Sequence, residues 1–267
     1  MPEALGGVHV IRSASCADCA KKTSRFEGEV ARDMWRDFRY ANNGPGKRKR
    51  RTKRPSLVTI PGADGSPSLT IPYGDYPAPA IFYRMGRAGI LNGLPAHIDT
   101  SAGWTLEAHG TGKAAQDFER VHNAPLTFRF KHMPQSFGRM LAKIGYCQAL
   151  TEFRLGEFEP VCMPHILGTD PNVSHIVGGV LGPAPPADTV GYRMGTTCVG
   201  GADRLLIVSD VRIFANVGTP MYHIVAGQIL GHSAVANAVK RHSDGQMAFF
   251  PDWASVLKAN WPQETSG

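Results

Sequence analysis

A run of positive charge in the first quarter of the chain limits what this sequence can fold into more than any other feature. Residues 47–54 read KRKRRTKR, so seven of these eight side chains are cationic at neutral pH. Cations without partners are strongly disfavoured in a protein interior, so the run has to pass through solvent. We therefore divide the chain into a small N-terminal module at residues 1–46, a basic linker at residues 47–55 and a larger domain at residues 56–267.

The basic run also carries the charge excess of the chain. The formal net charge is +7, and the run alone supplies seven positive charges, so the rest is close to neutral. Cations beside phosphates release condensed counterions, which gives salt-sensitive binding to nucleic acid of any sequence. The predicted contacts are Lys47, Arg48, Lys49, Arg50, Arg51, Lys53 and Arg54. The alternative is a solvated linker that its own repulsion keeps extended.

Base stacking is not expected of this run, because no aromatic residue lies between Ala41 and Pro72. In the module before it, Phe26, Val30, Met34 and Phe38 recur every four residues. This spacing predicts an amphipathic helix over about residues 20–40. The sequence NNGPG at residues 42–46 ends the helix. A short strand-prone run at residues 8–11 precedes it, so the module is expected to be a strand, a loop and a helix.

The larger domain is predicted to contain more strand than helix. Its strand-prone runs lie at residues 57–60, 68–71, 80–83, 104–108, 126–131, 205–214 and 222–229. Apolar residues at helical spacing between Phe137 and Leu150 predict a central helix, with Pro134 in its first turn. A short terminal helix is predicted at residues 253–261. The fold class that follows is α+β.

Cys16 and Cys19 form a CxxC pair, the spacing of two thiolate ligands on one tetrahedral zinc ion. A structural zinc ion needs four ligands, so the other two must come from elsewhere. The chain has five cysteines, an odd and sparse set that argues against a disulfide framework and for a reducing cytoplasm. The same spacing serves thiol–disulfide exchange, which stays open as an alternative, although no βαβ pattern accompanies it.

The order of motifs around this pair is informative. A PEALGG turn at residues 2–7 comes first, then CADC at residues 16–19, and then the predicted helix. This order resembles the zinc-knuckle HNH endonucleases of bacteria over about the first forty residues. Cys16 and Cys19 match the second of the family's two CxxC knuckles, and its Pro-x-x-Leu-Gly-Gly turn is matched by Pro2, Leu5, Gly6 and Gly7.

The resemblance implies a DNA endonuclease with a structural Zn²⁺ on the knuckles. A histidine just before the turn activates water, and Mg²⁺ or Mn²⁺ stabilises the charge that develops on the phosphate. Here Met1 directly precedes Pro2, so the histidine and the first CxxC are expected to be absent. Ala20 also stands where the family often has asparagine. The explanations left open are a start codon placed too late in a longer gene, a truncated gene, or a binding role without cleavage.

Other candidate residues favour structural interpretations. His9 is a possible replacement ligand or base, but a surface strand histidine is preferred. The GTGK sequence at residues 110–113 is predicted to be a turn and not a phosphate-binding loop. Glu107 stands where such a loop needs glycine, and Ala114 stands where it needs serine or threonine.

Among the remaining residues, Cys147 on the central helix is predicted to be a core residue, and Cys162 and Cys198 receive no role. Asp210 and Glu159 are predicted to be solvated surface carboxylates.

Taken as a sequence, the chain is predicted to be an HNH-type metal-dependent endonuclease acting on DNA, inactive as it stands because the catalytic histidine is absent. The alternative is a non-catalytic nucleic-acid-binding protein, and a third hypothesis is a thiol-redox protein that uses Cys16 and Cys19. No apolar run of about eighteen residues and no secretory signal are present, so neither a membrane partner nor secretion is expected. The sequence gives no indication of oligomeric state.

Overall fold

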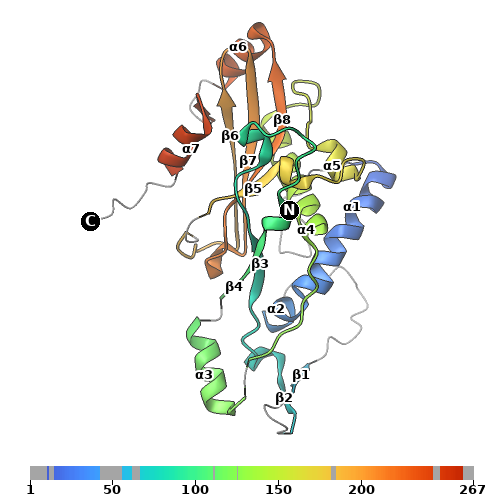
Figure 1. Cartoon of the computed structure of the whole chain (residues 1–267), viewed down its shortest axis with the longest axis vertical. Coiled ribbons are helices and arrows are strands. Elements are labelled where there is room, and N and C mark those ends of the chain that lie inside the picture. Colours follow the sequence, from blue (N-terminus) through green and yellow to red (C-terminus); the bar gives the residue numbers. More distant parts are fainter. Residues whose placement is uncertain are drawn as a thin grey trace, which may run out of the picture.

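The computed structural model describes residue 11 and residues 15–42, 56–61, 67–110, 112–124, 126–181, 185–242 and 247–260. Helices and strands are mixed along the chain, which agrees with the predicted α+β class. The predicted excess of strand over helix is wrong, because the described residues contain more helix than strand. The elements form a larger lobe around a five-stranded sheet and a smaller lobe at the opposite end of the molecule (Figure 1). In the part of the chain that is described, no helix is both long and apolar enough to cross a bilayer.

The predicted N-terminal helix is confirmed as three consecutive pieces. They are α1 (Ala17–Glu29), the π-helical turn η2 (Val30–Met34) and α2 (Arg36–Ala41). In the π turn the Trp35 N–H donates to the Val30 carbonyl at 3.0 Å, one residue further back than in an α-helix. The apolar stripe that predicted the helix is buried along its length, with Trp35 at 0% exposure.

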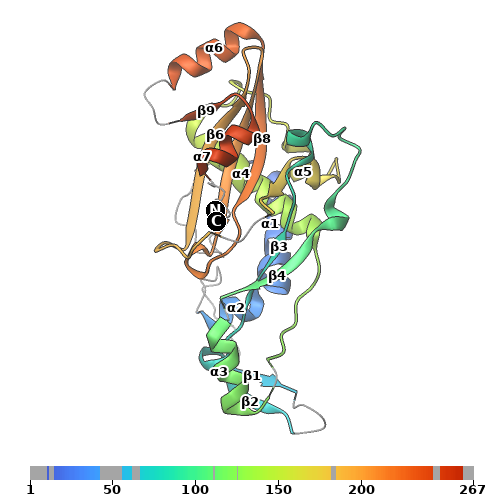
Figure 2. The ribbon, with the colours of Figure 1, turned by 60° about the vertical axis from the view of Figure 1, so that its left-hand side comes forward.

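The predicted central helix is α4 (Pro134–Glu152), and it lies between α1 and the sheet (Figure 2). The sheet has the strand order β5-β8-β7-β6-β9. All neighbours pair antiparallel except β6 and β9, which are parallel. The strands are β5 (Val177–Gly179), β6 (Tyr192–Gly200), β7 (Arg204–Ile213), β8 (Tyr222–Leu230) and β9 (Ala248–Phe250).

A glycine sets how closely α4 approaches this sheet. A Cβ atom at Gly145 would lie 2.6 Å from the Cβ of Ile224 on β8, closer than carbon atoms can pack. Beside it, the Ser209 hydroxyl of β7 donates to the Gly145 carbonyl at 2.8 Å. The opposite face of the sheet is covered by α7 (Trp253–Asn260), where Trp253 and Val256 are buried. This helix confirms the terminal helix predicted at residues 253–261.

The smaller lobe contains the hairpin of β1 (Leu57–Ile60) and β2 (Leu69–Pro72), together with α3 (Gly112–His122). Its own small core contains Ile60, Ile71, Tyr76 and Phe118. A second antiparallel pair, β3 (Ala80–Arg84) and β4 (Thr105–His109), joins this lobe to the larger one (Figure 1). All four strands were predicted, and each observed boundary lies within one residue of the predicted one.

Several predictions of local structure are wrong or incomplete. Residues 126–131 were predicted to be a strand, but they pair with no strand among the described residues; instead the Lys131 N–H donates to the Asp33 carbonyl of η2 at 2.9 Å. The turn predicted at residues 110–113 is confirmed only at Gly110, whose φ is +82°, because Gly112 and Lys113 belong to α3. The unpredicted elements are α3, α5 (Met163–Leu167), α6 (His232–Arg241), β5, β6 and β9.

The predicted boundary between module and domain lies outside the described residues, so it stays a prediction. The packing on its N-terminal side is nevertheless described. Phe26, Trp35 and Phe38 belong to one continuous core with Phe137 of α4 and Phe82 of β3. The helices at residues 17–41 therefore do not have a core of their own.

Candidate metal and nucleic-acid site

The CxxC pair lies at the start of α1. Cys16 is the N-cap of the helix, with φ −68° and ψ 166°, and its Sγ accepts the Cys19 N–H at 3.4 Å. Both thiols are free, Cys16 is exposed and Cys19 is half-buried. The two side chains lie within hydrogen-bonding reach of each other. This turn holds both sulfurs together at the edge of the molecule, where a metal ion or a second thiol can approach them.

The two thiols differ in acidity. The backbone N–H of Cys19 lowers the pKa of Cys16 from its ordinary value, and the hydrogen bond from the Cys19 thiol adds to this effect. The same thiol–thiol hydrogen bond raises the pKa of Cys19. Cys16 is therefore the group that first becomes a thiolate, which is the form that binds metals and attacks disulfides.

The described residues place two candidate metal ligands, Cys16 and Cys19, on one turn. Two cysteines at this spacing fit two corners of a tetrahedral ion. No group of three or more histidine, cysteine, aspartate or glutamate side chains within the described ranges is arranged to hold a metal. His9, the predicted alternative ligand, lies outside the described residues. The remaining ligands for Zn²⁺, and those for a catalytic Mg²⁺ or Mn²⁺, stay predictions.

The basic run at residues 47–54 also lies outside the described residues. Its flanking elements are described, since α2 ends at Ala41 and β1 begins at Leu57. The run is therefore the covalent connection between the N-terminal helices of the larger lobe and the hairpin of the smaller lobe.

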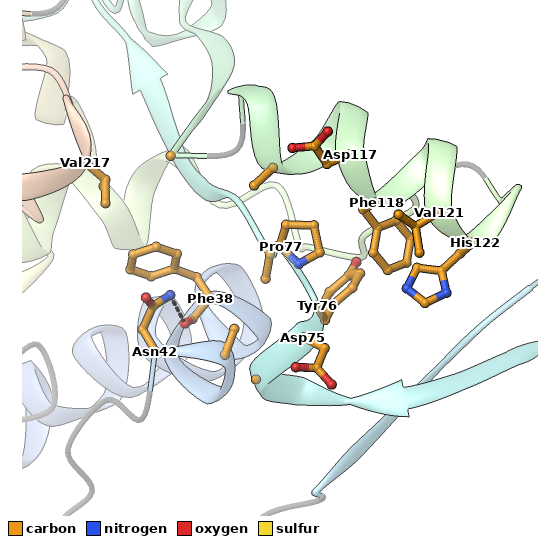
Figure 3. Close-up of a pocket in the computed structure, with 15 residues that line it drawn as sticks. Phe38, Asn42, Asp75, Tyr76, Pro77, Asp117, Phe118, Val121, His122 and Val217 are labelled. Carbon is orange, nitrogen blue, oxygen red and sulfur yellow. Dashed lines mark hydrogen bonds between the residues drawn. The ribbon is translucent and has the colours of Figure 1, made fainter.

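A cavity of about 520 Å³ lies between α2, α3 and the segment at residues 74–78 (Figure 3). Its aromatic rings are largely covered, with Tyr76 at 2% and Phe118 at 5% exposure. The Asn42 amide at its edge donates to the Phe38 carbonyl at 2.9 Å, the bond drawn in Figure 3. On the α3 side, Asp117 pairs with Arg120 at 3.1 Å. Asn42 and Asp117 are thus paired within the protein, and we assign the cavity no chemistry.

Asp210 was predicted to be a solvated surface carboxylate, and this is wrong. It lies on β7 opposite His223 of β8, and its Oδ1 is buried without a hydrogen-bond partner among the described residues. Burial raises the pKa of Asp210 to about 7. Strand alternation places Asp210 on the sheet face that α7 covers. The prediction for Glu159 is confirmed, since it is exposed and accepts the Gln228 amide at 2.8 Å.

His223, the neighbour of Asp210 on β8, is also a buried polar residue of the sheet. Its Nε2 accepts the Ala88 N–H at 3.0 Å, so the neutral ring carries its proton on Nδ1, which is buried and has no partner among the described residues. Burial lowers the pKa of His223 to about 3, and the nearby charge of Arg87 adds to this effect. Gly178 and Gly195 flank the pair on the adjacent strands.

The other cysteines are unsuited to metal binding or redox chemistry. Cys162 and Cys198 are buried, and burial raises the pKa of Cys198 to about 12. The predicted core residue Cys147 is half-buried on α4, and burial raises its pKa as well. Cys16 and Cys19 are therefore the thiols of the described chain that are positioned to react or to bind.

Comparison with known proteins adds no relative. No protein-family model matches the chain, and neither the curated proteins nor the solved structures yield a significant match.

Proposed function

We propose that this chain is a nucleic-acid-binding protein, with DNA as its target, built on an HNH-type zinc knuckle at Cys16 and Cys19. The observation that carries the proposal is the turn at the start of α1, where Cys16 caps the helix and its thiolate is stabilised by the Cys19 N–H. The basic run at residues 47–54 supplies the phosphate contacts. In this proposal zinc fixes the N-terminal end of α1, and the run binds the nucleic acid backbone.

Zinc binding is the first prediction. We expect the purified chain to retain Zn²⁺ and to bind Co²⁺ with thiolate-to-metal charge-transfer absorption, because both sulfurs lie on one turn. The double variant Cys16→Ser and Cys19→Ser should lose both the zinc and the absorption. Metal analysis and ultraviolet–visible titration measure this, and Cys147→Ser on α4 is the matched control. Metal content that is unaffected by the double variant would contradict the prediction.

Binding through the basic run is the second prediction. Replacing its seven cations by glutamine should weaken binding to duplexes of every sequence alike. The slope of log affinity against log salt should become less steep by about 6, since each phosphate contact contributes about 0.9. Fluorescence anisotropy over a salt series measures both effects. The control replaces the exposed Lys113 and Arg154, which lie elsewhere on the surface, by glutamine. The proposal would be contradicted if the basic-run variant and the control variant had the same affinity and the same salt slope.

DNA cleavage is the nuclease version of the same proposal. Cleavage would need a general base and a catalytic metal ion in addition to the zinc knuckle. Incubation with supercoiled plasmid and Mg²⁺ or Mn²⁺ tests for cleavage, and nicking that Cys16→Ser abolishes would favour the nuclease.

Thiol–disulfide exchange is the second candidate function, favoured by the opposite pKa shifts of Cys16 and Cys19 at a helix start. In such a protein the more acidic N-terminal thiolate attacks the substrate disulfide. Reduction of a model disulfide by the metal-free chain, lost in Cys16→Ser but not in Cys147→Ser, would favour this function over zinc binding.

A further inference from the structure

The segment at residues 126–132, LTFRFKH, joins α3 of the smaller lobe to α4 of the larger lobe without forming a helix or a strand. We call it the inter-lobe strip. Figure 2 shows it as a long stretch of chain between the two lobes. It is held by its backbone: the Thr127 carbonyl accepts the Tyr76 hydroxyl, and the Lys131 N–H donates to Asp33. Its position is fixed by these anchors, although no sheet forms.

Aromatic and cationic side chains alternate along the strip. The rings of Phe128 and Phe130 lie 6.2 Å apart with an interplanar angle of 29°. Phe128 packs partly against the main core, whereas Phe130 is 37% exposed. Arg129 and Lys131, the intervening and following residues, are exposed as well. Phe130 is thus a partly exposed aromatic residue flanked in sequence by two exposed cations.

Charged side chains of both signs lie near the strip. The exposed Arg32 lies on η2, the same π turn whose Asp33 carbonyl holds the strip. The nearby Glu29 already accepts Ser136 at 2.5 Å and pairs with Arg25 at 3.2 Å. The hydrogen bond from Ser136 lowers the pKa of Glu29 most, and the charges of Arg25 and Lys131 add to this effect. Arg129 and Lys131 therefore provide exposed positive charge next to the aromatic pair, whereas the Arg32 guanidinium lies over Gly28 of α1. The Glu29 carboxylate is already paired, and the Glu119 carboxylate of α3 accepts the Leu126 N–H at 3.0 Å.

We propose that the inter-lobe strip binds single-stranded nucleic acid, with an unpaired base stacked on Phe130 and the adjacent phosphates on Arg129 and Lys131. This inference rests on the proposed nucleic-acid function and names its substrate class. Bases in a duplex are stacked on one another, so an exposed phenyl face can accept only an unstacked base.

The experiment compares Phe130→Ala with wild type on a fluorescent single-stranded thymidine oligonucleotide and on a duplex. We expect the single-strand affinity to fall roughly 5- to 150-fold, from the loss of one base stack, while duplex affinity stays unchanged. Phe130→Trp should keep the single-strand affinity of the wild type, because an indole ring also stacks on bases. Leu155→Ala is the matched control, since Leu155 is an exposed apolar residue at 76% exposure outside the strip.

A second variant tests the phosphate contacts. The double variant Arg129→Gln and Lys131→Gln should reduce the slope of log affinity against log salt for the single strand by about 1.4, from two contacts of about 0.7 each.

The inference would be overturned if Phe130→Ala kept the wild-type affinity for the single strand. An equal loss of affinity for single strand and duplex would overturn it as well. Binding of an extended peptide along the strip, with single-strand affinity unaffected, would overturn it in favour of a protein partner. If the chain binds duplex through the basic run yet Phe130→Ala changes nothing, only this inference fails. If wild type binds no nucleic acid, the proposed function fails with it.

Discussion

Replacing Trp35 with alanine is expected to lower the free energy of unfolding of the whole chain by about 4 kcal/mol. Trp35 is fully buried, and its ring centroid lies 5.1 Å from Phe82, 5.8 Å from Phe137 and 5.1 Å from Phe214. Its Nε1 donates to the Ile81 carbonyl at 2.6 Å. Alanine would leave a cavity among three rings and a buried carbonyl without its donor.

Urea unfolding, followed by circular dichroism and by the emission of the remaining tryptophans, measures this effect. One of those tryptophans, Trp253, lies on the far face of the sheet, so its response shows whether the loss is global. Trp35→Phe is the control, because it keeps most of the ring packing and removes the hydrogen bond, at a cost of about 1 kcal/mol. If only the N-terminal helices lost stability, residues 1–46 would be an independent module after all.

The second large effect concerns pH. The folded-state pKa of Asp210 is raised from 3.8 to about 7, so the folded chain holds this proton more tightly than the unfolded chain. Its contribution to stability is therefore present below about pH 4 and is lost as the pH rises toward 7. We expect Asp210→Asn, which cannot ionise, to be more stable than wild type at pH 8 by roughly 2–4 kcal/mol and to differ little at pH 4.

Unfolding midpoints in urea between pH 3 and pH 9 measure this difference. His223 acts in the other direction: its folded pKa is lowered to about 3, so its contribution is present above about pH 6.5 and is lost as the pH falls through 3. Wild type should thus be most stable between about pH 4 and 6.5. Asp203→Asn, whose side chain is 85% exposed, should leave the profile unchanged. An Asp210→Asn profile that follows wild type above pH 6 would show that this carboxylate is solvated.

The long helices and the strands with continuous apolar runs were predictable from sequence, whereas the amphipathic helices α3 and α6 and the polar strand β6 were missed. The four-residue spacing from Phe26 to Phe38 and the apolar face of α4 gave both long helices, because burial and sequence period agree. β6 was missed because Gly195, Thr196 and Thr197 interrupt its apolar pattern, although its whole length pairs with β7. The inter-lobe strip has the alternating pattern of a strand, but its backbone bonds to the Tyr76 hydroxyl and the Asp33 carbonyl and not to another strand. The local sequence does not reveal these two partners.

One candidate site could be found from sequence and the other could not. Cys16 and Cys19 were predicted as a pair because a CxxC spacing places two thiols on one turn whatever surrounds it. The pair of Asp210 and His223 did not stand out, since only the register of β7 and β8 makes them neighbours. Register depends on long-range pairing, and a single aspartate within an apolar strand gives no other sign of burial.

The ring cluster around Trp35 also bears on how the protein is made. Phe214, which Trp35 contacts, is synthesised about 180 residues later. At about 5–20 residues per second, a ribosome needs roughly 10–40 s to deliver it. During that interval α1, η2 and α2 have no completed core to pack against, and their aromatic stripe is exposed to other nascent chains. The protein is therefore expected to need protection during translation, and its yield to depend on chaperone supply more than its final stability would indicate.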